Sequence, residues 1–400
     1  MPSSPSGSLN SPHSSRFASE LYPLYLAVFV AVLGFSLVAP IFPDYVMDLG
    51  ASYTLLGIIV SIYGAVQLIT QIPVGRLSDR SGRKRIMLLG LATFTLLPPL
   101  YIYADNAWFL LAVRSLGGLG ASAVWPIAMA LIVDQADSKS RGAAMGWYNA
   151  SFFSALALGP LIGGALYDRL GLYAPFYLWA ALGAASLLIV HWRVVEPERI
   201  VVQAGMSPPE KKDGLISPGY TLTFLACCSV VLWAGVVGGF NFTMLPSFAS
   251  DLGFSATDVG LIYLVYGGST AIFNIYFGRR ADRGSRRLLI FAGCLAGAVS
   301  FAFLNAATSL LHVSLLFAGL GMGLGMAGPA AAALIADTTS EKRRGEIYGI
   351  FNTSRMAGVV AGPLLAGVAA DTHGVGGAVM AFALLAAAIT LATLFVRESC

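Results

Sequence analysis

Two arginines, Arg114 and Arg355, stand in apolar stretches that hold almost no other charge. A guanidinium in a hydrocarbon environment is costly unless it faces water, a cavity or an anion. We therefore expect both side chains to line an interior cavity that favours neutral or anionic ligands over cations. Two alternatives stay open: Arg114 can reach the nearby outer surface with its long side chain, and Arg355 can bind backbone carbonyls.

The other reactive side chains do not form an enzyme centre. His13, His191, His312 and His373 are scattered, and none lies deep in an apolar stretch. The chain has no Gly-x-x-x-x-Gly-Lys-Ser/Thr phosphate loop, which excludes a nucleotide-driven pump. We expect no catalytic residue, no metal and no cofactor. Asp44 is the one acid near a central cavity and the candidate proton site; the alternative is an exposed carboxylate outside the membrane.

The elements that carry these residues are predicted to be membrane helices. Of 400 residues, 57% are hydrophobic and only 11% are charged, too few charges for a water-covered surface. A bilayer core needs about 20 apolar residues per helix. The first half has six such stretches, at roughly 22–43, 53–74, 86–104, 107–133, 142–166 and 175–194. The second half has six more, at roughly 219–246, 256–277, 288–306, 310–336, 346–369 and 376–396.

The basic residues predict the orientation. With the N-terminus inside, 21 of the 24 lysines and arginines fall on inner segments, and only Arg169 falls outside. We divide the chain into a disordered cytoplasmic tail (1–20), a first half (21–194), a cytoplasmic linker (195–218) and a second half (219–400). Both termini are expected in the cytoplasm, with the chain in the cell or inner membrane.

The two halves are copies that align without a gap at an offset of 203 residues. Pro43 matches Pro246, and Asp168 matches Asp371. Six helices per copy is an even number, so both copies enter the membrane in the same direction. We expect an all-α fold of twelve transmembrane helices in two six-helix halves, related by pseudo-two-fold symmetry, with a cavity between them.

A charged loop follows the second helix of each half. It reads GRLSDRSGRKR from Gly75 to Arg85, and GRRADRGSRR from Gly278 to Arg287. The first copy closely resembles the signature loop of the major facilitator superfamily; the second has Ser285 where a glycine is expected, so its turn is expected to differ. We define the latch cluster as the following residues: Gly75, Asp79, Arg80, Arg83, Asp134, Gly278, Asp282, Arg283, Arg286 and Asp337.

The resemblance implies that the latch cluster holds the halves together on the inner side while the outer side is open. Its contact would be the start of the eleventh helix, near Gly345 and Glu346. Arg83 is expected to pair with Asp79 and with Asp134. The alternative is a set of ordinary solvated charges on the inner surface.

Three further patterns resemble those of proton-coupled drug antiporters in this family. RSLGGLG, from Arg114, resembles the family's arginine on the fourth helix, and ALALGPLIGG, from Ala155, resembles the glycine-proline motif of the fifth. Pro40 and Pro43 suit the first helix of the 12-span group. The predicted kink and close-packing positions of the fifth and eleventh helices are Gly159, Pro160, Gly163, Gly164, Gly362, Pro363 and Gly367.

Other polar or aromatic side chains inside the helices are candidates for the cavity wall. They are Gln67, Gln71, Asn149, Asn241, Asn274, Asn352 and Trp125. Plain helix packing is the alternative for each. Phe317 corresponds to Arg114, and Phe152 to Arg355, so the halves differ where the two charges stand.

These patterns predict a secondary transporter that works by alternating access. The resemblance favours proton-coupled export of small lipophilic compounds, and the arginines favour neutral or anionic ones. The alternative is an importer of a metabolite such as an organic anion or a sugar. We expect a monomer that contacts a small-molecule substrate and the lipid bilayer, binds no nucleic acid and is driven by the proton gradient.

Overall fold

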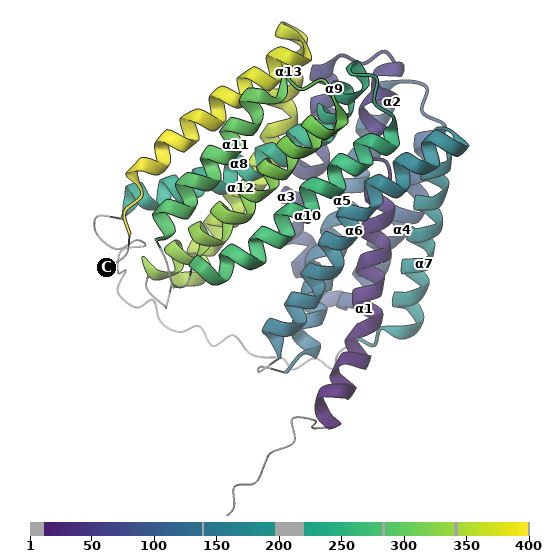
Figure 1. Ribbon diagram of the computed structural model, residues 1–400. Coiled ribbons are helices and arrows are strands. Elements are labelled where there is room, and N and C mark those ends of the chain that lie inside the picture. Colours follow the sequence, from purple (N-terminus) through teal and green to yellow (C-terminus); the bar gives the residue numbers. More distant parts are fainter. Residues whose placement is uncertain (1–11, 138–139, 197–219, 282–284, 340–342, 399–400) are drawn as a thin grey trace, which may run out of the picture.

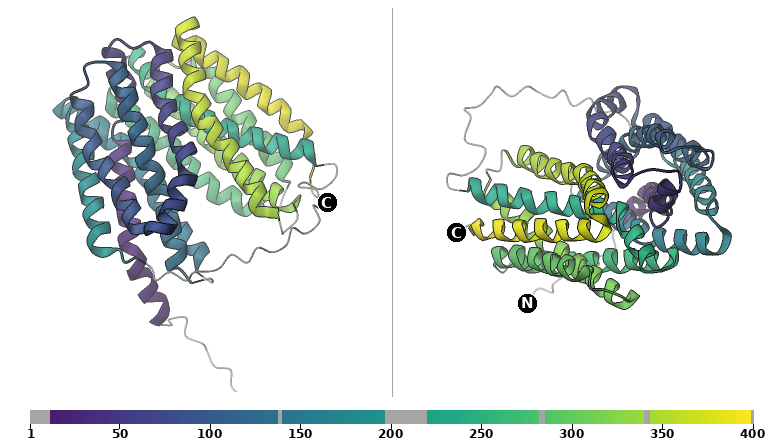
Figure 2. Two further views of the ribbon diagram at one scale, coloured as in Figure 1. Left: turned by 180° about the vertical axis from the view of Figure 1, so that it is seen from behind. Right: turned by 90° about the horizontal axis from the view of Figure 1, so that it is seen from above.

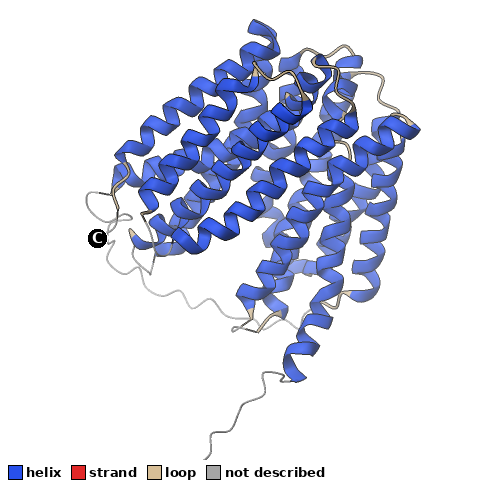
Figure 3. Cartoon of the chain, in the orientation of Figure 1, coloured by secondary structure: helices blue, strands red, loops and turns tan. Residues whose placement is uncertain are grey.

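The computed structural model describes residues 12–137, 140–196, 220–281, 285–339 and 343–398. All regular structure in these ranges is helical (Figure 3). The first half contains α1 (Pro12–Ser36), α2 (Phe42–Asp48), α3 (Tyr53–Ser81), α4 (Arg83–Ile102), α5 (Ala107–Gln135), α6 (Arg141–Leu170) and α7 (Ala174–Arg193). The second half contains α8 (Thr221–Thr243), α9 (Leu245–Asp251), α10 (Ala256–Ala281), α11 (Arg286–Leu304), α12 (Leu310–Asp337), α13 (Arg344–Ala392) and the 3₁₀ turn η2 (Thr393–Phe395).

Ten helices of the described chain are long and apolar enough to cross a membrane. The apolar part of α1, Leu21–Ser36, is shorter, and α13 joins two of the predicted stretches. At Gly374 the backbone of α13 leaves the helical region, with φ of 74°, where the chain turns back. Gly171, its repeat counterpart at the end of α6, has φ of 84°. The same left-handed glycine therefore ends the fifth helix and breaks the eleventh from the twelfth.

The first predicted helix differs from the observed one at both ends. α1 begins at Pro12, so residues 12–20, which we assigned to a disordered tail, continue this helix. α1 stops at Ser36, and the short helix α2 begins only at Phe42. Pro40 and Pro43 account for the interruption, because proline lacks an N–H donor and disfavours a helical residue before it. α9 repeats the arrangement after α8, with Pro246 in its first turn.

Polar side chains fix where several helices begin. Ser52 accepts a hydrogen bond from the N–H of Leu55, and Asn106 does so from Phe109. Ser285 caps α11 with φ of −65°, whereas its counterpart Gly82 has φ of 106°. The substitution at Ser285 thus changes the turn, because a serine avoids the left-handed region that glycine enters freely.

The helices form two bundles that converge at one end (Figures 1 and 2). One bundle holds α1–α7 and the other α8–α13, and the main packing between them joins α3 to α13 and α6 to α10. α2 and α9 lie at the end where the bundles meet, and the bundles diverge toward the opposite end (Figure 1). We call these the outer and inner ends, after the orientation that the basic residues predict.

Candidate functional site

Backbone contacts close the outer end. A Cβ atom at Gly57 of α3 would overlap the carbonyl oxygen of Pro363 in α13. A Cβ at Gly260 of α10 would lie 2.5 Å from the carbonyl oxygen of Pro160 in α6. These two contacts are related by the 203-residue repeat. The halves therefore meet where glycine leaves room for the backbone of the other half.

The motif glycines of α6 and α13 make two kinds of packing contact, some within their own half and others with the opposite half. Gly159 and Gly163 pack against α1, and Gly362 packs against α8, within their own halves. Gly164 and Gly367 pack across the interface, against the first residues of α10 and α3 respectively. The pattern that resembles an antiporter motif is thus partly an interface between the halves.

Two aspartates also tie the halves together at the outer end. The carboxylate of Asp371 accepts hydrogen bonds from the backbone N–H groups of Tyr53 and Thr54, at 2.9 and 2.8 Å. Its repeat counterpart Asp168 accepts one from the N–H of Thr257, at 2.9 Å, and one from the Thr257 hydroxyl. Each aspartate thus caps the positive N-terminus of a helix in the opposite half.

The latch cluster forms pairs within each half. The Nη2 atom of Arg83 lies 3.4 Å from Asp79, and its Nε lies 3.0 Å from Asp134. Arg286 pairs with Asp337 in the same way. Asp282 and Arg283 lie outside the described residues.

The ion pairs of Arg83 and Arg286 in the described residues stay within their own halves and do not reach the eleventh helix or its counterpart in the other half. Glu346 instead binds Arg343 of its own half, at 2.7 Å. A Cβ at Gly75 or Gly345 would meet nothing within 4 Å among the described residues, so neither glycine stands at a close helix contact in this conformation. Together with the closed outer end, this describes an inward-open arrangement. The inner lock itself stays a prediction for the other state.

An acid that follows the last helix of each half contacts the start of a helix that begins at a latch loop. Glu196 accepts hydrogen bonds from the N–H groups of Arg83 and Lys84, at 2.7 and 2.8 Å, and so caps α4. Glu398 accepts one from the N–H of Arg287 in α11, at 3.4 Å. The described ends of both halves thus anchor the helices that begin at the latch loops.

Arg114 lies in an aromatic cage under the outer closure. Its side chain is only 1% exposed, and its Cζ atom stands 3.8 Å from the centre of the Phe42 ring. The rings of Tyr63, Tyr101 and Phe242 lie 5.7–5.9 Å away. Phe242 belongs to α8, so the cage includes a ring from the second half. Arg114 does not reach the outer surface, which was the alternative placement.

Stacked rings continue from this cage toward the candidate cavity residue Trp125. Phe35 stacks on Tyr63, with centroids 5.1 Å apart, and on Phe242, at 6.0 Å. Trp125 stacks on Phe94 and meets Phe152 edge to face at 5.7 Å. Phe152, the repeat counterpart of Arg355, thus belongs to an aromatic wall that an apolar ligand would suit.

Arg355 occupies a different environment from Arg114. Its side chain is exposed, and its Nε and Nη2 atoms lie 3.4 and 3.3 Å from the Oδ1 atom of Asn352. It lies four residues, or about one turn, from Val359, which packs against Gly64 of α3. Arg355 therefore stands on the inner side of the contact between the halves and is open to water.

The other polar candidates follow the same interface toward the inner end. Gln71 lies seven residues beyond Gly64, two turns along the face of α3 that meets α13, and Gln67 is half-buried on the turn between. Asn274 of α10 is the repeat counterpart of Gln71 and is exposed. Asn149 is exposed on α6. Whether these side chains line a cavity between the halves stays a prediction.

Asn241 is buried and not part of this open surface. It is 3% exposed, and neither its Nδ2 nor its Oδ1 atom has a hydrogen-bond partner in the described structure. Its backbone carbonyl accepts a hydrogen bond from the Tyr263 hydroxyl at 2.5 Å. Asn241 directly precedes Phe242 of the aromatic cage in α8.

Acids of the described chain stand at helix ends and loops, away from the membrane centre. Asp44 lies in α2 at the outer closure. Burial raises the pKa of its carboxyl to about 6, and the nearby charges of Asp48 and Asp251 contribute to that rise. Asp44 is thus a titratable group at the contact between α2 and α9.

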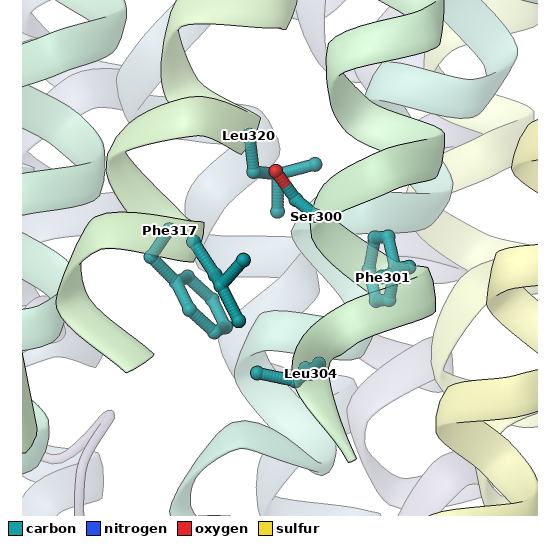
Figure 4. Close-up of a pocket in the computed structure, with 6 residues that line it drawn as sticks. Ser300, Phe301, Leu304, Phe317 and Leu320 are labelled. Carbon is teal, nitrogen blue, oxygen red and sulfur yellow. The ribbon is translucent and has the colours of Figure 1, made fainter. Parts of the chain in front are cut away.

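A small hollow lies at the repeat-equivalent position of Arg114 (Figure 4). It is partly open to solvent and lies between α11 and α12. Phe317, Leu304 and Ser300 line it, and the first two replace Arg114 and Tyr101 of the other half. The second half therefore has an apolar space where the first half has a caged cation.

Sequence reasoning missed most partners of these residues. It did not identify the cage rings Phe42, Tyr101 and Phe242, and it recorded Asp168 and Asp371 only as matched outer acids. The match at offset 203 was the one signal that singled out the aspartates. Their partners lie 89 and 318 residues away along the chain, a separation that no local pattern reveals.

Comparisons with known proteins place the chain in a family. The model of the Major Facilitator Superfamily matches residues 24–244 and again 222–399. Inner membrane transport protein YajR of Escherichia coli K12 is 30% identical over 349 residues, which are 84% of this chain and 74% of that protein. Quinolone resistance protein NorA of Staphylococcus aureus strain MSSA476 is 27% identical, covering 88% of this chain and 90% of NorA.

A solved structure shares the fold. A mutant form of the nucleoside transporter NupG superimposes with a TM-score of 0.79 at 12% identity, covering 94% of this chain and 99% of that one. The two family matches extend over almost the whole chain and fall on its two halves. The chain therefore belongs to the major facilitator superfamily, a family of multi-pass membrane transporters and not of enzymes.

Proposed function

We propose that the chain is a proton-coupled exporter of small lipophilic compounds that are neutral or anionic. It would work by alternating access, with twelve membrane crossings in two six-helix halves, in the cell or inner membrane with both termini inside. The latch cluster would hold the inner side closed in the opposite state. A monomer suffices for this cycle.

One observation carries the choice of substrate charge. In the described chain the central turns of the membrane helices contain two charged side chains, Arg114 and Arg355, and both are cationic. A cationic compound near either arginine is repelled, and the low dielectric around the buried Arg114 strengthens that repulsion. The aromatic wall at Trp125 and Phe152 supports a lipophilic substrate body.

Three observations support export and proton coupling. The glycine-proline pattern of α6 resembles that of drug antiporters, and NorA, a similar protein, is named for quinolone resistance. Asp44 supplies a carboxyl that titrates near pH 6 at the outer closure. It is our candidate proton site.

Transport in vesicles tests the proposal. Inside-out vesicles with an acidic lumen are given a matched set of cationic, neutral and anionic aromatic compounds. An antiporting exporter accumulates the neutral or anionic ones, and dissipating the pH gradient abolishes accumulation. Accumulation that ignores the gradient would remove the antiport mechanism. Arg355→Ala should reduce transport of the anion more than that of the neutral compound; equal rates would remove Arg355 from the binding surface.

The alternative is an importer of a metabolite such as an organic anion or a sugar. The two arginines suit an organic anion, and a protein of similar fold, NupG, is named as a nucleoside transporter, which supports a polar metabolite as substrate. Right-side-out vesicles with acid outside separate the two functions. A proton-coupled importer accumulates substrate there, and an exporter does not.

A further inference from the structure

The guanidinium of Arg114 has a free edge that no protein group satisfies. Its Nε and Nη2 atoms are buried and have no hydrogen-bond partner in the described structure. These two nitrogens flank one side of the guanidinium plane, so their N–H groups point in the same direction. Two parallel donors on one edge match the two oxygens of a carboxylate in a bidentate pair.

The cage holds the cation without neutralising it. The Phe42 ring faces the Cζ atom at 3.8 Å, and cation–π attraction of this kind is weaker than an ion pair. None of the ion pairs in the described part of the chain involves Arg114. A buried and unpaired charge is strongly unfavourable, so the site gains most from a ligand that brings an anion.

A third donor stands in the same cage. The hydroxyl of Tyr63 is buried and donates to no acceptor in the described structure, although Trp125 stands close enough to act as a donor to its oxygen, and its ring centre lies 5.9 Å from the Arg114 Cζ atom. A tyrosine hydroxyl can donate to an oxyanion that already bridges the guanidinium edge. The apolar surroundings on this side are the rings of Phe35 and Phe242.

We propose that the free edge of Arg114, with the Tyr63 hydroxyl, is a carboxylate subsite for an aromatic or lipophilic monoanion. The inference rests on the proposed function in that this monoanion is the transported substrate. The carboxylate would take both N–H groups of the Arg114 edge, and the ring system would pack against Phe35 and Phe242. The caged arginine thus selects anionic over neutral compounds.

The cage also ties this subsite to the transport cycle. Phe35, Tyr63 and Phe242 are half-buried, so part of each residue around Arg114 remains accessible. Phe42 comes from α2, and Phe242 comes from the opposite half, so two walls belong to segments that meet at the outer closure. Separating the halves at that end would move Phe242 away from Phe35, so a ligand bound between them would lose one of its two ring contacts when the outer end opens.

Binding to the purified full-length protein, without any gradient, tests the subsite. Calorimetry compares 2-naphthoate with its isosteric amide, 2-naphthamide, at about pH 8, where the carboxylate is ionised. We expect the carboxylate to bind about tenfold tighter or better. Arg114→Gln should bring the two affinities to within about threefold of each other, and Arg114→Lys should restore only part of the preference, because an ammonium lacks the flat two-donor edge.

Matched variants keep the test specific. Tyr63→Phe keeps the ring and should lower the carboxylate affinity about fivefold while leaving the amide unchanged. Arg169→Gln removes an exposed arginine at the outer end of α6 and should change neither affinity. If Arg114→Gln does not fold, Arg114→Lys and Tyr63→Phe still decide the result.

Three outcomes would overturn the subsite. In the first, the wild-type protein binds 2-naphthoate and 2-naphthamide equally, and in the second, Arg114→Gln retains the preference for 2-naphthoate. In the third, chloride displaces 2-naphthoate as effectively as acetate does, which indicates a site for any small anion. Failure of the proposed function looks different. In that case the binding preference survives while transport in vesicles ignores the pH gradient.

Discussion

Removal of the Asp371 carboxylate should open the outer end. This side chain caps the first turn of α3 in the opposite half through two hydrogen bonds of 2.9 and 2.8 Å. Loss of a charged N-cap costs about 1–2 kcal/mol where the helix terminus is not otherwise satisfied. Because the bonds exist only while the halves touch, Asp371→Ala should raise the outward-open population about 5–30-fold.

The effect of the counterpart residue should be similar and independent. Asp168 caps α10 and shares no partner with Asp371, so the two free-energy changes should add in the double variant. Asp371→Asn retains one acceptor oxygen and should give a smaller shift. Partial burial raises the pKa of Asp371, but the hydrogen bonds from Thr54 and Tyr53 outweigh it and hold that pKa below its ordinary value. The tie is therefore complete above the ordinary pKa and is lost only as the pH falls below it.

Labelling of one cysteine can measure the opening. Ser61 of α3 is 8% exposed, and its hydroxyl donates to the carbonyl oxygen of Val360 across the interface at 2.6 Å. Ser61→Cys, in a background without the native cysteines, should react with an impermeant maleimide from outside in proportion to the outward-open population. Asp371→Ala should speed this reaction by the factor given above.

Asp105→Ala serves as the matched control. Asp105 is an exposed aspartate on the outer loop between α4 and α5, within one half, so its loss should leave the labelling rate unchanged. If Asp371→Ala also leaves the rate within about twofold of the parent protein, then the two hydrogen bonds do not hold the outer end closed. The same conclusion follows if Asp105→Ala and Asp371→Ala give equal accelerations.

Three further predictions concern the closure and the cap of α4. Gly57→Val should speed the labelling of Ser61→Cys at least as much as Asp371→Ala does, because the valine side chain would overlap the carbonyl of Pro363. The control Gly238→Val, at a position where a Cβ has open space, should leave the labelling rate unchanged. Glu196→Gln should lower the melting temperature by about 2 °C in detergent, because the cap of α4 loses its charge; an unchanged melting curve would count against this cap. The raised pKa of Asp44 means that closing the outer end takes up a proton, so closure should strengthen as the pH falls through about 6. Distances between spin labels on α2 and α9 should show this, and in Asp44→Asn they should no longer depend on pH.

Hydropathy and the internal repeat predicted most of the fold. Helices occupy all twelve predicted stretches in the described chain, and repeat partners such as Gly57 and Gly260 make equivalent contacts. The errors in the predicted helix ends fall where proline interrupts the helix within a long apolar stretch. The predicted first helix ran to Pro43, but the helix ends at Ser36, before its prolines.

The candidate site was predictable only in part. The cost of a charge in lipid singled out Arg114, but its cage brings together rings from α2, α3, α4 and α8. Helical periodicity shows which face of one helix a residue occupies, not which distant helices pack against it. The latch residues differ, because Arg83, Asp79 and Asp134 follow from a loop sequence and an adjacent helix end.

The glycine contact at Gly57 has a mechanical consequence. It lies four residues from the start of α3 and 24 from its end, or about 6 Å and 36 Å along the axis. A rigid tilt about this point sweeps the inner end about six times as far as the outer end, so it can open one side of the membrane but hardly the other. For the outer side to open, the point of contact must move along α3 toward the inner end, past Gly64, beside which Val360 of α13 already lies. The contact between the halves therefore moves along α3 during the cycle, over the small residues Gly57, Ser61 and Gly64, and the halves do not turn about one fixed residue.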